Sequence, residues 1–150
     1  MRLIYTKVPA EVCKKNRTFY KNHVRKAFVM WCAYEGYFDG VFTKAEIKKA
    51  KKGQLPNDCN IHHKMPLSGT AEPYVNEFEN LVVLHKNTHE ELNKYIFAPQ
   101  LKAIQNAPFG TQIAIEVPQY GYVDARGIKA ERAMQANIRK GLKRNPRATR

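Results

Sequence analysis

Residues 59–93 constrain the fold of this chain more than any other stretch, because two extended runs and a helical pattern follow one another there within a short length. Residues 61–67 indicate a short extended segment, and a loop with turn residues at 68–79 separates it from an apolar run at 81–84. A four-residue apolar run is typical of a buried strand. A unit of this size has little core of its own, so we expect the flanking segments to cover it.

A helix is expected directly after the second run. Thr88 or Asn87 can cap its start, and the pattern continues to about Phe97, with Pro99 just beyond its end. Upstream, apolar residues recur every three or four positions between residues 17 and 34. That spacing predicts an amphipathic helix that can pack on the central unit.

Shorter elements are expected in both flanks. Thr43 and Glu46 have the spacing of a capping box, so a lysine-rich helix should begin there and end near Lys52. Alternation at 111–117 indicates a strand, and the residues from about 124 to 142 favour a helix followed by a disordered basic tail. We therefore expect an α+β fold with helical, basic flanks.

The predicted organisation is one domain with an extension. The domain covers residues 1–125 and has a helical N-terminal flank at 1–56 and a central unit at about 59–97. The C-terminal extension is basic and covers 126–150. A chain of 150 residues is long enough for one packed core, and a second full domain is not expected.

The positive charge of the chain is concentrated in its flanks. The net charge is +13; residues 1–56 hold thirteen Lys and Arg against four acids, and residues 126–150 hold nine against one. The centre, 57–125, holds four bases against eight acids. Basic flanks of this kind can grip a polyanion such as a nucleic acid. The alternative is an ordinary solvated Lys and Arg surface.

Several protein classes are excluded by composition. No stretch is long and apolar enough to span a membrane, and the first twelve residues lack the apolar core of a signal peptide. We expect a cytoplasmic protein, of a bacterium or a phage-infected cell, with no membrane partner and no small-molecule cofactor. Three widely spaced cysteines, Cys13, Cys32 and Cys59, are expected as free thiols; Cys59 is also a minor metal candidate.

Four side chains carry the chemistry that the sequence indicates. His62 and His63 point to opposite faces if their segment is extended, so they are not expected to share one duty. His89 and Asn93 are four residues apart and lie on one helical face, as two ligands of one ion must. One of the paired histidines can then join them on a metal, while the other takes a proton from water.

These residues resemble a known family. The stretches Cys59-Asn-Ile-His-His, Phe78-Glu-Asn-Leu-Val-Val-Leu and Thr88-His-Glu-Glu-Leu-Asn are similar to the ββα-metal finger of the HNH endonucleases. The resemblance covers about 35 residues, from Cys59 to Asn93, and leaves the flanks unmatched. It implies a ββα-metal core, phosphodiester hydrolysis and double-stranded DNA as the partner.

The resemblance also implies a role for each residue. His63 matches the general base, and His62, His89 and Asn93 match the metal ligands. Asn80 matches the middle asparagine, which braces the loop and orients the base. Asn76 is a lesser candidate for that bracing role. One divalent ion is expected; an amide ligand favours Mg²⁺, while Mn²⁺, Ni²⁺ and Zn²⁺ remain open.

Contacts to the DNA backbone are expected from cations near the base and in the C-terminal extension. They are Lys64, Arg126, Arg132, Arg139 and Lys140. Phosphate contacts of this kind confer affinity and no choice of sequence.

Other functions stay open at this point. A non-catalytic DNA-binding module could use the same finger, and an RNase or a toxin nuclease could carry it. A chain that begins with Met and lacks a delivery region favours a free-standing phage or mobile-element nuclease, on analogy alone. Recognition sequence, nicking or double-strand cleavage, the physiological ion, oligomeric state and biological role are not predicted.

Overall fold

The computed structural model describes residues 1–70 and 74–144 and has mixed α and β structure. The strands are β1 (Arg2–Thr6), β2 (Cys59–His63), β3 (Leu81–His85) and β4 (Gln112–Glu116). The α-helices are α1 (Ala10–Phe19), α2 (Arg25–Tyr34), α3 (Lys44–Ala50), α4 (Lys86–Glu91), α5 (Ala98–Lys102) and α6 (Ala125–Arg144). Wide π-helical turns are η1 (Tyr20–Val24) and η4 (Leu92–Phe97), and η2 (Tyr74–Asn76) and η3 (Phe78–Asn80) are 3₁₀ turns. The α+β class is confirmed.

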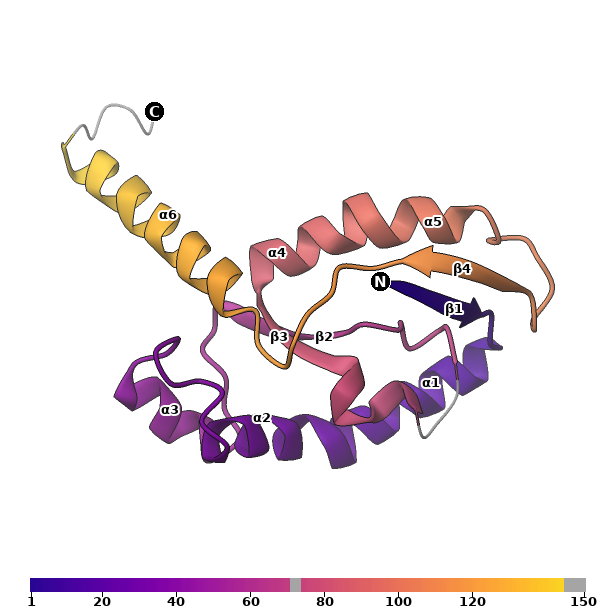
Figure 1. Ribbon diagram of the computed structural model, residues 1–150, viewed down its shortest axis with the longest axis horizontal. Coiled ribbons are helices and arrows are strands. Elements are labelled where there is room, and N and C mark those ends of the chain that lie inside the picture. The colour runs from indigo at the N-terminus through magenta and orange to yellow at the C-terminus, as the bar shows by residue number, and fades with distance from the viewer. Residues whose placement is uncertain (71–73, 145–150) are drawn as a thin grey trace.

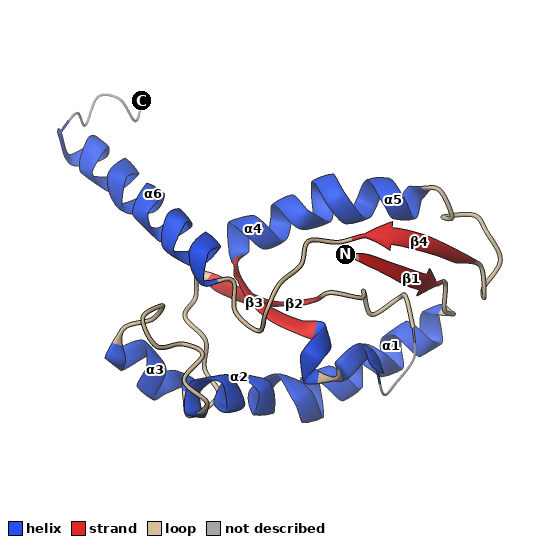
Figure 2. Ribbon diagram, viewed as in Figure 1, coloured by secondary structure: helices blue, strands red, loops and turns tan. Residues whose placement is uncertain are grey.

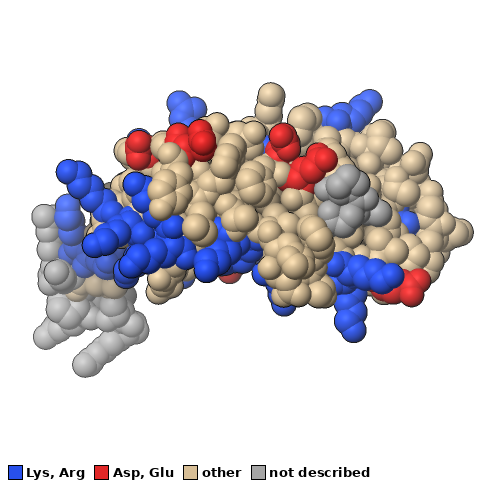
Figure 3. All heavy atoms as spheres, turned by 90° about the horizontal axis from the view of Figure 1, so that it is seen from below, with Lys and Arg blue, Asp and Glu red and all other residues tan. Residues whose placement is uncertain are grey.

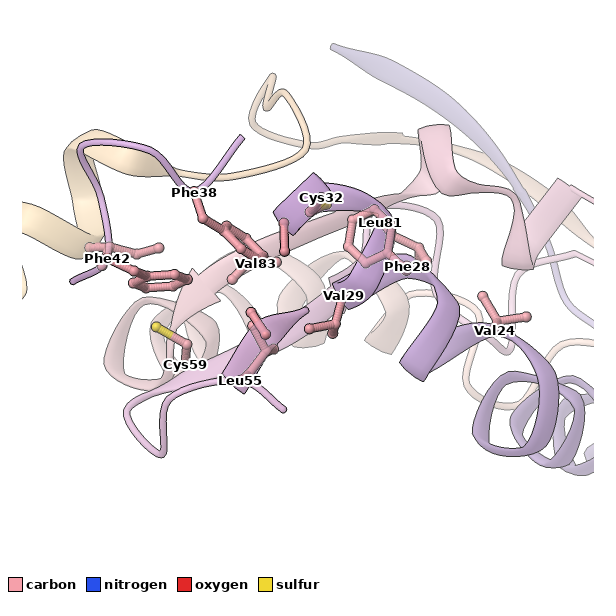
Figure 4. Packing of buried hydrophobic residues seen from close by; sticks show 13 residues of the cluster. Val24, Phe28, Val29, Cys32, Phe38, Phe42, Leu55, Cys59, Leu81 and Val83 are labelled. Atoms are coloured by element: carbon pink, nitrogen blue, oxygen red, sulfur yellow. The ribbon is translucent and has the colours of Figure 1, made fainter. Parts of the chain in front are cut away.

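Strand β3 lies at the centre of the molecule, and all five of its residues are buried. Alternate side chains of a strand point to opposite faces. Leu81 and Val83 pack with Phe28 and Cys32 of α2 in one hydrophobic cluster, which Figure 4 shows at close range. Val82 and Leu84 belong to a second cluster on the other face. The continuous apolar run of the sequence is therefore explained by a strand covered on both sides.

Two small antiparallel ribbons lie between two sets of helices (Figures 1 and 2). One ribbon pairs β2 with β3, so that Cys59 faces His85 and His63 faces Leu81. The other pairs β1 with β4, the two strands being about 110 residues apart in the chain. Helices α1 and α2 lie along one side in Figure 1, and α4, η4 and α5 along the other. The second cluster joins the ribbons, since Tyr5 of β1 packs with Val82.

The N-terminal flank contains more structure than the sequence indicates. The predicted helix at 17–34 begins earlier, at Ala10, and continues through η1 into α2. Strand β1 was not predicted, because only a ribbon partner far along the chain stabilises it. The capping box is confirmed: the Thr43 hydroxyl accepts from the Glu46 amide and the Glu46 carboxylate from the Thr43 amide.

Three predicted boundaries are wrong. Strand β2 begins at Cys59 and ends at His63, because the chain turns where the Lys64 amide donates to the Asn80 carbonyl. His85 caps α4 in place of Asn87 or Thr88, its Nδ1 accepting from the Asn87 amide. Pro99 does not follow the helix end, since it lies in the first turn of α5, where no amide hydrogen is needed.

The predicted loop residue Pro73 and the predicted tail at 145–150 lie outside the described residues.

Helix α6 is anchored in the body by its first turns. Ile128 is fully buried in the cluster with Leu81 and Val83. One turn later, the Arg132 guanidinium donates to both carboxylate oxygens of Asp58, at 2.8 and 2.9 Å, and to both of Glu46, at 2.9 Å each. These bonds hold two carboxylates and weigh against Arg132 as a DNA contact, which stays a prediction. The remainder of α6 extends outward, as Figure 1 shows.

Two expectations about composition are met. Cys13, Cys32 and Cys59 are all free thiols. Among the helices of the described residues, none has the length and apolar character needed to cross a membrane.

The Arg132 contacts predict an acid-sensitive stability. Hydrogen bonds from Arg132 are the largest cause that lowers the pKa of both Asp58 and Glu46. A lowered folded-state pKa means that the carboxylates stabilise the fold at neutral pH, and that this stabilisation is lost as pH falls below their ordinary values of 3.8 and 4.5. Arg132→Gln should destabilise the protein by about 1–3 kcal/mol at pH 7, measured by urea unfolding.

Urea unfolding at lower pH provides a second test. The difference in the free energy of unfolding between the wild type and Arg132→Gln should shrink as Asp58 and Glu46 become protonated. Arg139→Gln, an exposed change on the same helix, should alter stability by less than about 0.5 kcal/mol. Equal stability of the Arg132 and Arg139 variants at pH 7 would contradict the proposed strength of the network.

Candidate active site

The end of β2 sends its two histidines to different sides of the ribbon. The His62 ring packs against His89 of α4 and Phe97 of η4, with centroid separations of 5.2 and 5.1 Å. The His63 ring lies 4.6 Å from the ring of Tyr20, on η1. The expected opposite orientation is thus present, and each ring meets a different helix.

One cavity of about 460 Å³ brings the predicted residues together. His62, His63, His89 and Asn93 all border it. His62 and His63 are the last two residues of β2, and their rings reach this cavity from different sides of the ribbon. The opposite wall of the cavity is formed by α1 and η1, which contribute Arg17, Tyr20 and Lys21 among others.

Asn80 is a structural brace and does not border the cavity among the described residues. It is 2% exposed, and its Oδ1 accepts from the Met65 amide at 2.7 Å. Its Nδ2 donates to the carbonyls of Met65 and Val75. These bonds tie the loop at Val75 to Met65. Buried in this way, Asn80 braces the loop, and its role in catalysis stays a prediction.

Asn76 orients the His63 ring directly. The Asn76 Nδ2 donates to the Asn16 carbonyl at 3.0 Å, which leaves its Oδ1 to face the His63 Nε2 at 2.9 Å. An amide oxygen can only accept, so the Nε2 of His63 must carry the proton. The Nδ1 of a neutral ring then has a free lone pair. The sequence ranked Asn76 below Asn80, yet Asn76 contacts the ring.

The rings of His62 and His89 are close neighbours. Their centroids are 5.2 Å apart in a T-shaped contact. The Nδ1 of His89 also lies 3.3 Å from the Asn60 amide nitrogen. The Asn60 amide nitrogen can only donate, so the Nδ1 of His89 accepts this bond and the proton of the neutral ring lies on Nε2. Binding of an ion by His89 would require this contact to change.

The third predicted ligand, Asn93, is an amide in η4 that borders the same cavity. Among the described residues, no group of three or more His, Cys, Asp or Glu side chains is placed to hold a metal ion. The predicted set combines two imidazoles, which suit Zn²⁺ and Ni²⁺, with one amide oxygen, which suits Mg²⁺ and Mn²⁺. Cys59 does not border this cavity among the described residues, and burial raises the pKa of its thiol to about 12.

Burial keeps the three imidazoles neutral. It is the largest cause that lowers the pKa of His62 to about 3 and also lowers the pKa of His63 and His89. Repulsion of a charged His62 by cations at His89, His63 and Lys64 also lowers the pKa of His62, and the hydrogen bond to Asn76 opposes the lowering at His63. Neutral imidazole is the form that binds a metal or accepts a proton, so the site is prepared for both at pH 7.

Lys64 is held against the loop before β3. Its side chain is nearly buried, and the ammonium donates to the Glu79 carbonyl at 2.9 Å. This bond uses one of the three donors of the ammonium, and a phosphate contact at Lys64 stays a prediction. Arg126, Arg139 and Lys140 are exposed on α6, and none of them borders the cavity among the described residues.

Sequence reasoning missed the contributions of Asn16, Asn60, Arg17 and Lys21. The Asn16 Nδ2 donates to the carbonyls of Leu67 and Thr70, tying α1 to the loop beside the site. A buried polar residue within an amphipathic helix was the available signal for Asn16. No local pattern distinguishes Arg17 or Lys21 from the other cations of the N-terminal flank.

The Asn76 contact predicts the tautomer of His63. In protein treated with EDTA at pH 7.5, nitrogen-15 spectra of the histidines should show His63 with its proton on Nε2, because Asn76 can only accept there. Asn76→Ala removes that acceptor, so the Nε2 preference should weaken. His23, which is exposed and packs on Phe19, provides the internal comparison and should not respond. A proton on Nδ1 in the wild type would contradict this geometry.

Comparison with known proteins gives one relative. The chain is similar to the uncharacterized protein YhhZ of Escherichia coli (strain K12), with 28% identity over 92 residues. The matched part is 61% of this chain and 23% of that protein, so this chain spans less than a quarter of the relative's length. No family model matches the chain. No solved structure matches it.

Proposed function

We propose that this chain is a metal-dependent DNA endonuclease of the HNH type, with a ββα-metal finger formed by β2, β3 and the helix that begins at α4. The observation that carries the proposal is the shared cavity: His62, His63, His89 and Asn93 lie on three separate elements and all border it. The α4 helix follows β3 directly, which supports the order of elements that the resemblance implies.

His63 is the proposed general base. Its Nε2 is held by Asn76, so Nδ1 is the atom that accepts a proton from water. Its lowered pKa keeps the ring neutral at pH 7. The activated water forms a bond to phosphorus as the bond to the leaving oxygen breaks, and the leaving oxygen takes a proton from solvent. The proton on Nδ1 then returns to solvent, and the Asn76 contact holds the ring in place.

His62, His89 and Asn93 are the proposed metal ligands. A divalent ion bound there would supply Lewis-acid neutralisation of charge on the phosphate and on the leaving oxygen. Phe97 packs on the His62 ring, and Asn60 contacts the His89 ring. Asn80 and Asn76 are positioning residues, since they act through the loop and through His63.

Replacing the proposed base tests the enzymatic function. His63→Ala should lower the rate of supercoiled-plasmid cleavage in Mg²⁺ by about 10²–10⁴-fold, because a positioned general base contributes that much. DNA binding, measured by fluorescence anisotropy in EDTA, should be retained. His23→Ala is the matched control, being an exposed histidine away from the cavity, and should cleave like the wild type.

The outcome also decides between the open alternatives. A wild type that binds DNA and never nicks it in Mg²⁺, Mn²⁺, Ni²⁺ or Zn²⁺ would be a binding module. Cleavage of RNA in preference to DNA would make it an RNase. Unchanged plasmid cleavage by a folded His63→Ala variant would contradict the proposed role of His63 as the general base.

The ligand set predicts a metal preference. Asn93→His replaces a hard oxygen ligand with an imidazole, so activity should shift from Mg²⁺ toward Zn²⁺ and Ni²⁺. Isothermal titration with each ion in the absence of DNA separates ligand effects from catalysis. Asn87→His, on α4 and outside the cavity lining, is the control. An unchanged order of metal affinities in Asn93→His would exclude Asn93 as a ligand.

A further inference from the structure

Two cations from the N-terminal helix lie on the cavity wall opposite the proposed ligands. Arg17 of α1 and Lys21 of η1 both border the cavity that holds His63. They are four residues apart, so they lie along one side of the helix. Both side chains are exposed. No Asp or Glu is among the described residues that line this cavity.

These charges are available, unlike those of the other cations near the centre. Within the described residues, no hydrogen bond or ion pair involves the side chain of Arg17 or Lys21. Arg132, by contrast, holds Glu46 and Asp58, and Lys64 donates to a backbone carbonyl. An unpaired cation beside a neutral site is suited to bind an anion.

A second hollow continues the basic wall along α1. It has a volume of about 510 Å³ and is bordered by Lys14, Arg17 and Lys21. Arg17, Lys21 and Cys13 border both hollows, so the two adjoin. Among the described residues that border the second hollow there is also no Asp or Glu. We call Lys14, Arg17 and Lys21 the α1 strip.

The more visible basic surface lies elsewhere. Figure 3 shows the molecule from the side of α1 and α2, with Lys and Arg gathered mainly toward the end where α3 and α6 lie. Among the described residues of that end, none borders the cavity with His63. Such a surface can add general affinity, but it cannot place a phosphate beside the histidines.

We propose that the α1 strip binds the phosphate backbone of the DNA strand that is cut. Arg17 and Lys21 contact phosphates at the cavity, and the strand leaves along α1 past Lys14. This inference rests on the proposed function and deepens it, because it assigns the substrate path to the N-terminal helix. The C-terminal cations predicted from the sequence, Arg139 and Lys140, are outside this path.

The test compares charge removal at three places. The double variant Arg17→Gln/Lys21→Gln removes the cations at the cavity. Lys48→Gln/Lys52→Gln removes two exposed cations, also four residues apart, at α3, and Arg139→Gln/Lys140→Gln removes two on α6. Binding to a labelled mixed-sequence duplex of about 12 base pairs is measured in EDTA between about 50 and 200 mM salt. Cleavage of the same duplex is measured in Mg²⁺ and Mn²⁺.

A plot of log affinity against log salt concentration has a slope that reports the number of phosphate contacts. For the α1 variant this slope should be smaller in magnitude by about two, which is about one for each contact removed. The kcat/KM of the α1 variant for cleavage should fall about a hundredfold, as expected when donors to the reacting phosphate are removed. The α3 variant should cleave within about twofold of the wild type, since distant exposed charges are screened. Thermal melting of all three variants shows whether each is folded.

Several results overturn the inference. If the α6 variant loses more slope and more kcat/KM than the α1 variant, the strand runs along α6. If the α1 and α3 variants bind and cleave alike, the strip holds no phosphate, while cleavage by the wild type keeps the proposed function intact. If the wild type binds DNA and never cleaves it, the proposed function fails, and the binding data alone decide on the strip. A wild type that does not bind the duplex overturns both.

Discussion

The burial of β3 on both faces is the constraint on which the rest of the structure depends. Leu81 and Val83 need α2 on one side, and Val82 and Leu84 need the second cluster on the other. Each fully buried aliphatic side chain stabilises the fold by about 1.5–3 kcal/mol. Covering both faces forces the N-terminal helix and the helix after β3 to opposite sides of the ribbon. The candidate site is formed where those two helices come closest to the end of β2.

This arrangement explains how one short segment can carry two kinds of chemistry. The strand alternation turns His62 toward α4 and η4 and His63 toward η1. Each ring then takes its character from the helix that it meets. Burial beside His89 and Phe97 keeps the His62 ring neutral, and the contact with Asn76 gives His63 one defined tautomer.

Much of this could be predicted from the sequence, and the exceptions share a cause. The buried run at β3 and the capping box of α3 follow from local periodicity and spacing, whereas the grouping of His62, His63, His89 and Asn93 is expected from the family resemblance. Strand β1, the Asn76 contact and the roles of Arg132 and Lys64 depend on partners far along the chain. Asn80 and Asn76 illustrate the difference, because both are asparagines of one loop and only their tertiary neighbours distinguish a brace from a partner of the ring.

The bonds of Asn16 couple the helix that would hold the DNA to the histidine that would act on it. The Asn16 side chain fastens α1 to the loop at Leu67 and Thr70, and its carbonyl receives the Asn76 amide that in turn faces His63. A shift of α1 can therefore reach the imidazole through Asn16 and Asn76, beside the direct contact of Tyr20 with the ring. In the proposed enzyme, the binding of a strand to α1 and the orientation of the His63 ring would be coupled, so a strand that binds α1 poorly would also meet a misaligned ring.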